Sequence, residues 1–436
     1  MNNQLDKILI SSSQPEWHAR LREIHAAVKS ATYFEDGSDE DKQLDNILKK
    51  VSGRGGDAAI TEFTENFDGV MLPSENFRVA QKDLAKARKG IDPILLKSIH
   101  QAIENVLKYQ TEIFIGNKNT HSGIKYTPIE RVGICVPGAS APLPSTVIMT
   151  AVPAQVAGVK EIVVVSPPRY KGSIHPVILG ICYELGIDEI YRIGGAQAVA
   201  ALAFGTQTIK PVNKIVGPGN QWVQMAKRKV FGIVDIDSIA GPSEVLIIAN
   251  DKANPAWVAA DMLSQVEHSP GSALVFTDSE NIAQKILEEL KIQIGRLSRK
   301  DSTNRCLLKY GAIITFENME QVVKQTNFFA AEHLQIQCGA QSKAIAREVK
   351  NAGAIFIGDY SPVAVGDYWA GPSHTLPTGM TAKFFSPLSA NDFIKSTSII
   401  EYNKEQLAES AADIIRLAEA EGLDAHAKSV KIRQQD

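Results

Sequence analysis

The strongest constraint on the fold of this chain is an alternation of short β-branched runs with helix-patterned stretches, which begins near residue 130. The runs with the length and composition of buried strands are residues 132–136, 162–165, 189–193, 214–216, 245–248, 273–276 and 354–357. The stretches with helical patterning between them are residues 147–157, 196–204, 221–230, 255–265 and 279–292. Strand, loop and helix repeated at this spacing predict parallel sheet built from βαβ crossovers.

The chain is too long for a single small domain. Its 436 residues are about three times a typical domain length, so we expect more than one such sheet. The first hundred residues and the last fifty are patterned as helices instead. Ser38 before three acidic residues, and Asp92 before Pro93, are typical of helix N-termini. Both ends are therefore predicted to be helical extensions of an α/β core.

The composition excludes several classes of protein. The 46 Lys and Arg against 49 Asp and Glu leave a net charge of −3, which argues against a nucleic-acid partner. The longest apolar stretch, residues 145–159, contains Pro153 and Gln155 and is too short to cross a membrane. The first residues lack the apolar core of a signal peptide. The four cysteines are widely spaced without a CxxC pair, which indicates reduced thiols in the cytoplasm.

Three glycine-containing loops, at residues 133–138, 194–197 and 217–220, follow or contain predicted strand ends and precede helices. Parallel sheets bind ligands at the carboxyl ends of their strands, so loops that follow strands are the first to consider. Glycines there let backbone N–H groups approach an anion such as a dinucleotide pyrophosphate. None of the three has the G-x-G-x-x-G fingerprint, and glycines also serve simply as tight turns. Spacing alone leaves both interpretations open.

Two pairs of polar residues are candidates for chemistry. Gln265 and His268 are three residues apart and share one helix face, where they can ligate one cation. A histidine that interacts with the helix C-terminus explains the same pattern. Glu332 and His333 are adjacent at a helix-to-strand transition and are candidates for a general acid/base pair. Adjacent side chains diverge in regular structure, so a shared site there requires irregular backbone.

Two further segments carry candidate residues. The segment 358–377 is rich in Gly, Pro, Asp, His and aromatic residues, and long loops of this kind are often functional. Asp367 and His374 are its candidates for contact with a ligand or metal. The segment 421–426 contains Glu421 and His426 but follows no strand, so on its own it indicates a solvated histidine.

Taken in order, these segments resemble the histidinol dehydrogenase family. The stretches that carry the resemblance are Val-Pro-Gly with Ala-Pro-Leu at 136–143, Gly-Gly-Ala-Gln-Ala at 194–198, Val-Gly-Pro-Gly-Asn at 216–220, Ala-Gly-Pro-Ser-Glu-Val at 240–245, Ser-Gln-Val-Glu-His at 264–268, Ala-Glu-His-Leu at 331–334, Gly-Asp-Tyr at 366–368, Ser-His-Thr-Leu-Pro-Thr at 373–378 and Glu-Gly-Leu-Asp-Ala-His at 421–426. Each is weak alone, but nine in the right order are highly specific. The resemblance covers nearly the whole chain from about residue 20.

The resemblance implies a zinc-dependent, NAD-linked dehydrogenase that oxidises L-histidinol through L-histidinal to L-histidine, the last steps of histidine biosynthesis. It also implies a cytoplasmic homodimer in which the C-terminal segment of one subunit reaches the partner's site. The expected fold is α/β, with two incomplete Rossmann-like parallel-sheet domains and helical N- and C-terminal extensions. The expected divisions are an N-terminal extension at 1–30, a first domain at 31–134 and 242–380 with the metal and acid/base residues, an NAD-binding domain at 135–241, and a C-terminal extension at 387–436.

The resemblance also implies roles for individual residues. The implied acid/base residues are Glu332 and His333, and the implied NAD contacts are Gln197 and Asn220. The implied zinc ligands are Gln265, His268, Asp367 and His426. The implied substrate contacts are Ser243, Gln265, His268, His333, Asp367, His374, Glu421 and His426. Nitrogen and oxygen donors without thiolate are compatible with zinc.

The chain departs from the family pattern at one loop. Where the family usually has Tyr in Val-Gly-x-Tyr-x-Pro-Gly-Gly, this chain has Cys135, and Ala139 replaces the second Gly of the final pair. An aromatic contact to NAD is therefore either missing or supplied by another residue.

Three other functions compete with this interpretation. A paralogous zinc and NAD dehydrogenase would act on another amino alcohol or diol, although the full set of implied substrate residues argues against it. A metal-dependent hydrolase would use Glu332 as the base for a zinc-bound water and would need no nicotinamide. A non-catalytic metal-binding dimer would keep the metal without turnover.

Overall fold

A computed structural model of the chain describes residues 2–30, 33–116, 123–138, 142–267 and 271–434. These residues form two compact units. The first contains Met1–Ile115 and Pro128–Phe393, and the second contains Gly116–Thr127 and Ile394–Asp436. The first unit contains two parallel sheets, and the second contains a two-stranded sheet and a pair of helices.

One parallel sheet of the first unit has six strands in the order β1-β10-β9-β8-β11-β12. Their bounds are β1 (Leu9–Ser11), β10 (Gly311–Thr315), β9 (Gly271–Thr277), β8 (Ser243–Ala249), β11 (His333–Gln337) and β12 (Ala354–Ile357). His333 lies opposite Val245 on one side and Ala354 on the other, so β11 is an interior strand. Strands β9, β10 and β11 are buried along their whole length, as expected for interior strands of a parallel sheet.

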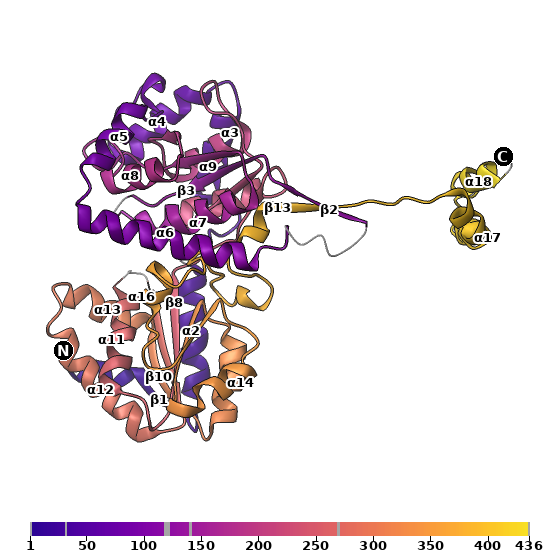
Figure 1. The fold of residues 1–436 in the computed structure, drawn as a ribbon. Coiled ribbons are helices and arrows are strands. Elements are labelled where there is room, and N and C mark those ends of the chain that lie inside the picture. The colour runs from indigo at the N-terminus through magenta and orange to yellow at the C-terminus, as the bar shows by residue number, and fades with distance from the viewer. Residues whose placement is uncertain (1, 31–32, 117–122, 139–141, 268–270, 435–436) are drawn as a thin grey trace. The chain divides into compact units, whose positions relative to one another are not determined.

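Helices cover both faces of this six-stranded sheet, and Figure 1 shows β8 and β10 between α11 and α12 on one side and α14 on the other. The helices of this part are α1 (Asn2–Leu5), α2 (Glu16–Ser30), α11 (Pro255–Val266), α12 (Glu280–Ile294), α13 (Lys300–Tyr310), α14 (Met319–Phe329), α15 (Ser342–Glu348) and α16 (Val363–Tyr368). Leu21 and Ile24 of α2 belong to the same hydrophobic core as β8 and β9. The N-terminal segment is thus an integral part of this layer, with β1 as an edge strand.

The other parallel sheet has five strands in the order β5-β4-β3-β6-β7. Their bounds are β5 (Glu189–Tyr191), β4 (Glu161–Val165), β3 (Arg131–Cys135), β6 (Lys214–Val216) and β7 (Asp235–Ile236). The helices of this part are α3 (Asp39–Ser52), α4 (Gly56–Asp68), α5 (Gln81–Lys89), α6 (Pro93–Ile113), α7 (Pro144–Ala157), α8 (Pro176–Glu184), α9 (Gly195–Phe204) and α10 (Gln221–Val230). Ile47 and Ile60 pack in one core with Val163 and Ile215 of the sheet.

Two predicted helix N-termini are confirmed. The Ser38 hydroxyl accepts a hydrogen bond of 3.1 Å from the backbone N–H of Asp41. The Asp92 carboxylate accepts bonds of 2.9 and 3.0 Å from the N–H groups of Ile94 and Leu95, with Pro93 in the first turn.

The second unit contains strands β2 (Ile124–Pro128) and β13 (Ile394–Ser398) and helices α17 (Lys404–Ala420) and α18 (Asp424–Lys431). Asn403 and Gln406 form a reciprocal capping box at the start of α17. A 2.6 Å ion pair between Lys431 and Glu419 joins the two helices.

The predicted fold class is confirmed, because two parallel sheets carry the crossover helices and both ends of the chain are helical. The domain divisions stay a prediction. Residues 34–77 share a core with the five-stranded sheet, whereas our divisions assigned residues 31–134 to the metal and acid/base domain. Among the described residues, no helix is long and apolar enough to cross a membrane.

Candidate active site

Glu332 and His333 lie at the amino end of β11, where both side chains are buried. Ala330, two residues earlier, has a φ of 51°, so the backbone between α14 and β11 is irregular, as a shared site requires. The Ser243 hydroxyl and the backbone N–H of Glu244 donate hydrogen bonds of 2.7 and 2.8 Å to the same oxygen, Oε2 of Glu332. The first residues of β8 therefore hold the carboxylate of the neighbouring strand in place.

The first residues of β8 also orient the ring of His333. Its Nδ1 lies 3.0 Å from the backbone oxygen of Glu244, which can only accept, so Nδ1 carries a proton. Nε2 has no hydrogen-bond partner among the described residues and lies 3.8 Å from Oδ1 of Asp367. Burial lowers the pKa of His333, but the carboxylates of Glu332 and Asp367 outweigh burial and raise it to about 9. Below about pH 9 the ring is therefore charged, and Nε2 can accept a proton only after the imidazolium has lost one.

Asp367 and His374 belong to the same cluster. Asp367 lies near the end of the short helix α16, and His374 lies in the loop that follows. Burial lowers the pKa of His374, while the charges of Asp367 and Glu332 oppose this effect. Nε2 of His374 lies 3.1 Å from the hydroxyl of Ser145 in the first turn of α7. The structure thus brings together Ser243, Glu332, His333, Asp367 and His374.

Glu244 is a member of this cluster that we did not predict. Its side chain is 1% exposed, and Oε1 accepts a 3.1 Å hydrogen bond from the N–H of Gly379. Burial and the charge of Glu332 raise the pKa of Glu244 to about 8. The residue was visible in the motif at 240–245, but nothing in that motif indicated that its carboxyl group would be buried.

The position of this cluster differs from that of the loops considered first. Those loops follow strands, whereas Ser243 and His333 are the first residues of β8 and β11, in agreement with the helix-to-strand transition predicted at Glu332 and His333. The cluster therefore lies at the amino edge of the six-stranded sheet. The turn between α14 and β11, rather than a strand-to-helix loop, provides the irregular backbone on which the acid/base pair depends.

The remaining predicted zinc and substrate residues lie in different parts of the chain, and one lies outside the described residues. Gln265 lies in the last turn of α11, 3% exposed, and its Nε2 has no hydrogen-bond partner among the described residues. His268 lies outside the described residues. Glu421 and His426 belong to the second unit, where both are exposed. Within the described ranges, no group of three or more His, Cys, Asp or Glu side chains is arranged to hold a metal, so the zinc site stays a prediction.

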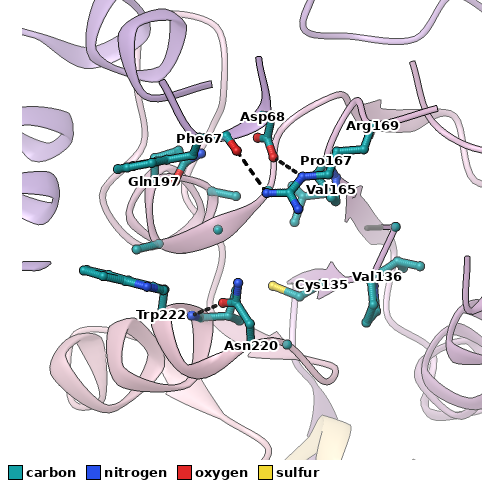
Figure 2. A pocket seen from close by; sticks show the side chains of 18 of the residues that line it. Phe67, Asp68, Cys135, Val136, Val165, Pro167, Arg169, Gln197, Asn220 and Trp222 are labelled. Carbon is teal, nitrogen blue, oxygen red and sulfur yellow. Dashed lines mark hydrogen bonds and ion pairs between the residues drawn. The ribbon is translucent and has the colours of Figure 1, made fainter. Parts of the chain in front are cut away.

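A cavity of about 610 Å³ lies at the carboxyl edge of the five-stranded sheet (Figure 2). All three glycine-containing loops contribute to it, through Gly138, Gly194 and Gly219 among others. Two of these loops lead into the N-termini of α9 and α10, where backbone N–H groups favour anions. The volume is within the usual range for small-molecule and cofactor sites. The cavity thus lies at the carboxyl ends of the strands, where parallel sheets generally bind ligands.

Both predicted NAD contacts line this cavity. Gln197 is 1% exposed, and neither Nε2 nor Oε1 has a hydrogen-bond partner among the described residues. Gly195 has a φ of 69°, and a Cβ there would lie 2.7 Å from Oε1 of Gln197. Asn220 is the N-cap of α10, where Oδ1 accepts a 3.2 Å bond from the N–H of Val223. A buried amide with no partner is costly unless a ligand satisfies it.

Three further residues of the cavity, Trp222, Asp68 and Arg169, were not predicted, whereas Cys135 was named as the departure from the family pattern. Cys135 lies at the end of β3 on the cavity wall, so the departure from the family pattern falls directly on this site. Trp222 supplies an aromatic ring from α10, packed on Phe34 with ring centroids 4.7 Å apart. Figure 2 shows Asp68 and Arg169 on the opposite wall from Trp222 and Cys135. Nothing in the local sequence of Asp68 or Arg169 distinguished them from ordinary surface charges.

Comparison with known proteins agrees with this geometry. Residues 33–434 match the sequence profile of the histidinol dehydrogenase family. Two relatives named histidinol dehydrogenase, from Rhodopirellula baltica and Oceanobacillus iheyensis, are each 46% identical to this chain. The matches cover 89% and 91% of this chain and 86% and 93% of the relatives. The crystal structure of histidinol dehydrogenase from Elizabethkingia anophelis has a TM-score of 0.89 and 34% identity, over 98% of both chains.

The structure combines two parallel sheets with a buried carboxylate–imidazole pair and a cofactor-sized cavity at helix N-termini. These features define the class of protein as an α/β oxidoreductase that uses a dinucleotide. The chain belongs to the histidinol dehydrogenase family and is an NAD-dependent oxidoreductase.

Proposed function

We propose that the chain oxidises L-histidinol through L-histidinal to L-histidine at the amino edge of the six-stranded sheet. The observation that carries this proposal is the buried pair of Glu332 and His333, in which Nε2 of His333 has no hydrogen-bond partner within the part of the chain that the structure describes. The family to which the chain belongs supports the choice of substrate. NAD⁺, when bound in the cavity beside Gln197 and Asn220, supplies the hydride acceptor.

His333 acts as the base for alcohol oxidation. The carbonyl of Glu244 keeps the proton on Nδ1, so Nε2 is the atom that accepts the hydroxyl proton of the substrate. Both carboxylates that raise its pKa also stabilise the imidazolium that results. After the first step, His333 carries one more proton and must lose it before it can assist the second oxidation.

Glu332 activates water for attack on the aldehyde. Oε2 already accepts two hydrogen bonds, from Ser243 and the backbone of Glu244, and these fix the plane of the carboxylate. A carboxylate held in one orientation by strand ends needs little reorganisation to take a proton from water. The enclosure of the pair, with Glu332 and His333 only 7% and 4% exposed, limits escape of a reactive aldehyde between the two steps.

We further propose that one zinc ion per subunit is held by Gln265, His268, Asp367 and His426. The donor types present fit a cation: Asp367 lies in the acid/base cluster, with Oδ1 3.8 Å from Nε2 of His333, and Gln265, 3% exposed, carries an amide oxygen that can act as a ligand. Zinc, when bound, would hold and orient polar groups of the substrate. The predicted substrate contacts are Ser243, Gln265, His268, His333, Asp367, His374, Glu421 and His426.

A homodimer with a shared active site is part of the proposal. The second unit carries Glu421 and His426 and exposes large apolar side chains, with Ile400 at 84%, Leu417 at 68% and Ile432 at 63%. Apolar surface of this extent on a two-helix arm is typical of a segment covered by another chain. We therefore propose that the arm completes the site of the partner subunit, in a cytoplasmic enzyme.

The experiment that tests the function follows NADH formation from L-histidinol with and without a chelator. We expect two NADH per histidine formed, and loss of activity on chelation that zinc restores. Turnover without nicotinamide would instead support the metal-dependent hydrolase. A zinc-loaded protein that is inert toward histidinol but oxidises another amino alcohol would support the paralogue.

The Glu332→Gln variant separates an enzyme from a metal-binding protein. We expect it to retain zinc, measured by elemental analysis, and to lose conversion of histidinal to histidine. A variant that retains full conversion would remove Glu332 from the mechanism.

A further inference from the structure

The proposed activity assigns no role to Asp68, whose buried carboxylate lies on the cavity wall. Asp68 is the last residue of α4, and its side chain is 4% exposed. Oδ1 accepts a 2.6 Å hydrogen bond from Nε of Arg169, but Oδ2 is buried with no hydrogen-bond partner among the described residues. A buried carboxylate oxygen without a hydrogen-bond donor lowers the stability of the fold, so this atom is available to a ligand that supplies a donor.

Arg169 fixes the direction of this carboxylate. In addition to the bond from Nε, its Nη2 donates a 3.1 Å bond to the backbone oxygen of Phe67 (Figure 2). The guanidinium is thus bound to two consecutive residues at the end of α4. Its side chain is 40% exposed, so the arginine covers the carboxylate on the solvent side while Asp68 lines the cavity.

The chemistry of the missing donor is restricted by charge. A buried carboxylate with a free oxygen accepts hydrogen bonds from hydroxyl groups and repels phosphate oxygens. The parts of a dinucleotide that can donate are the ribose hydroxyls, the adenine amino group and the nicotinamide carboxamide, and of these only a ribose hydroxyl differs between NAD⁺ and NADP⁺. In nucleotide-binding α/β sheets generally, an acidic side chain on the ribose favours NAD⁺, because NADP⁺ carries a phosphate in place of one hydroxyl.

The position of Asp68 indicates which ribose it meets. The cavity wall at Leu143 leads within two residues to Ser145, which contacts His374 of the acid/base cluster. That end must receive the nicotinamide, since hydride transfer occurs there. Asp68 comes instead from α4, which packs against α3 and α9, and it lies on a wall of the cavity that we assign to the adenosine half.

We propose that Oδ2 of Asp68 accepts the ribose hydroxyls of the adenosine half of the dinucleotide and so selects NAD⁺ over NADP⁺. Arg169 is a positioning residue that orients this carboxylate and neutralises part of its charge. The proposal rests on NAD use in this cavity and adds the residue that determines cofactor choice. Removal of the Asp68 charge leaves the Arg169 cation without its partner, next to the position where the phosphate of NADP⁺ would lie.

The test measures binding and turnover of NAD⁺ and NADP⁺ by the full-length enzyme and four variants. For Asp68→Asn we expect weaker NAD⁺ binding, stronger NADP⁺ binding and a fall of about tenfold or more in discrimination, mostly through KM. Glu62→Gln is the matched control, because it removes the same charge from the same helix at an exposed ion pair with Lys50. We expect no change in discrimination for this control.

Arg169→Gln separates positioning from direct phosphate binding. If Arg169 only orients Asp68, the variant loses some NAD⁺ affinity, gains no NADP⁺ affinity, and is partly rescued by Arg169→Lys. Unchanged discrimination in a folded Asp68→Asn variant, or an equal loss of both cofactors in Arg169→Gln alone, would overturn the proposal. Direct binding of the two cofactors, measured without substrate, keeps this result independent of whether histidinol is the substrate.

Discussion

The hydroxyl of Ser243 donates a 2.7 Å hydrogen bond to Oε2 of Glu332, and these residues lie at the starts of adjacent parallel strands. The sheet itself therefore sets the geometry of the acid/base pair. Because His333 immediately follows Glu332 and bonds to the backbone of Glu244, both members of the pair depend on the first two residues of strand β8.

We expect Ser243→Ala to lower kcat/KM for histidinol by roughly 10- to 100-fold, since a hydrogen bond to a charged group contributes about 1.5–3 kcal/mol. Glu332 keeps its second bond, from the N–H of Glu244, so the loss should be smaller than for Glu332→Gln. Ser264→Ala, at an exposed serine of α11, is the control. Steady-state kinetics check this prediction, and equal activity of the two serine variants would contradict it.

A buried ion pair supports the loop at residues 217–220 on the cavity wall. Lys227 is fully buried, pairs with Asp237 and donates a 3.1 Å bond to the backbone oxygen of Gly217. Asp237 accepts a 2.7 Å bond from the N–H of Gly217. Both charges thus bond to one residue of the loop.

We expect Lys227→Met to destabilise the protein by about 3–5 kcal/mol, because it leaves the Asp237 charge buried without its partner. NAD⁺ affinity should fall as well, since the loop loses its support. Lys229→Met, three-quarters buried on the same helix and paired with Asp41 and Asp45, should cost about 1 kcal/mol or less. Denaturant unfolding and NAD⁺ titration measure both effects, and similar stability of the two variants would refute this account.

The helices and strands predicted correctly from the sequence are those whose apolar and polar residues match their buried and exposed positions in the fold. All seven β-branched runs form strands, and α10 has the predicted bounds of 221–230. Strand β11, His333–Gln337, was expected only as the end of a helix-to-strand transition and was not among the β-branched runs, because Gln335 and Gln337 interrupt its apolar pattern, although both are buried. Its burial follows from packing between β8 and β12, which no local pattern reveals.

The site was also predictable only in part, because the sequence shows local motifs but not the packing between distant segments. Motif order pointed to Glu332, His333, Gln197 and Asn220, which the structure places at one buried cluster and one cavity. Asp68 could not be identified, because it follows an exposed Phe67 at an ordinary helix end and its carboxylate is paired with Arg169, 101 residues away. Contacts between distant segments are set by tertiary packing, and one sequence does not show them.

Asp261 on α11 should make stability depend on pH. Burial raises its pKa to about 6, although Gln335 and Gln337 oppose this, the latter through a 2.8 Å bond. An acid with a raised folded-state pKa costs nothing below its unfolded pKa of about 4, and the cost grows as pH rises and is complete above about 6. The folded state binds the proton more tightly, so wild-type stability falls across this window.

The variant Asp261→Asn removes this cost. We expect its stability relative to wild type to increase between about pH 4 and 6.5, by up to about 2–3 kcal/mol, and then to level off. Asp301→Asn, at an exposed position on α13, is the control and should show no such increase. Urea unfolding at several pH values measures this, and a difference that is constant with pH would show that Asp261 keeps its charge in the fold.

Trp222 is the residue we expect to replace the aromatic contact that Cys135 cannot make. Its ring lines the cavity and packs against Phe34. It is one of four tryptophans in the chain. NAD⁺ should therefore quench part of the protein fluorescence, and the quench should disappear in Trp222→Phe while affinity is largely kept. Trp222→Ala should weaken binding roughly 2- to 10-fold, as expected for loss of aromatic stacking worth about 0.5–1.5 kcal/mol. Trp257→Phe, at a half-exposed tryptophan near Tyr360, is the matched control. Quenching that persists in Trp222→Phe and disappears in Trp257→Phe would place the dinucleotide elsewhere.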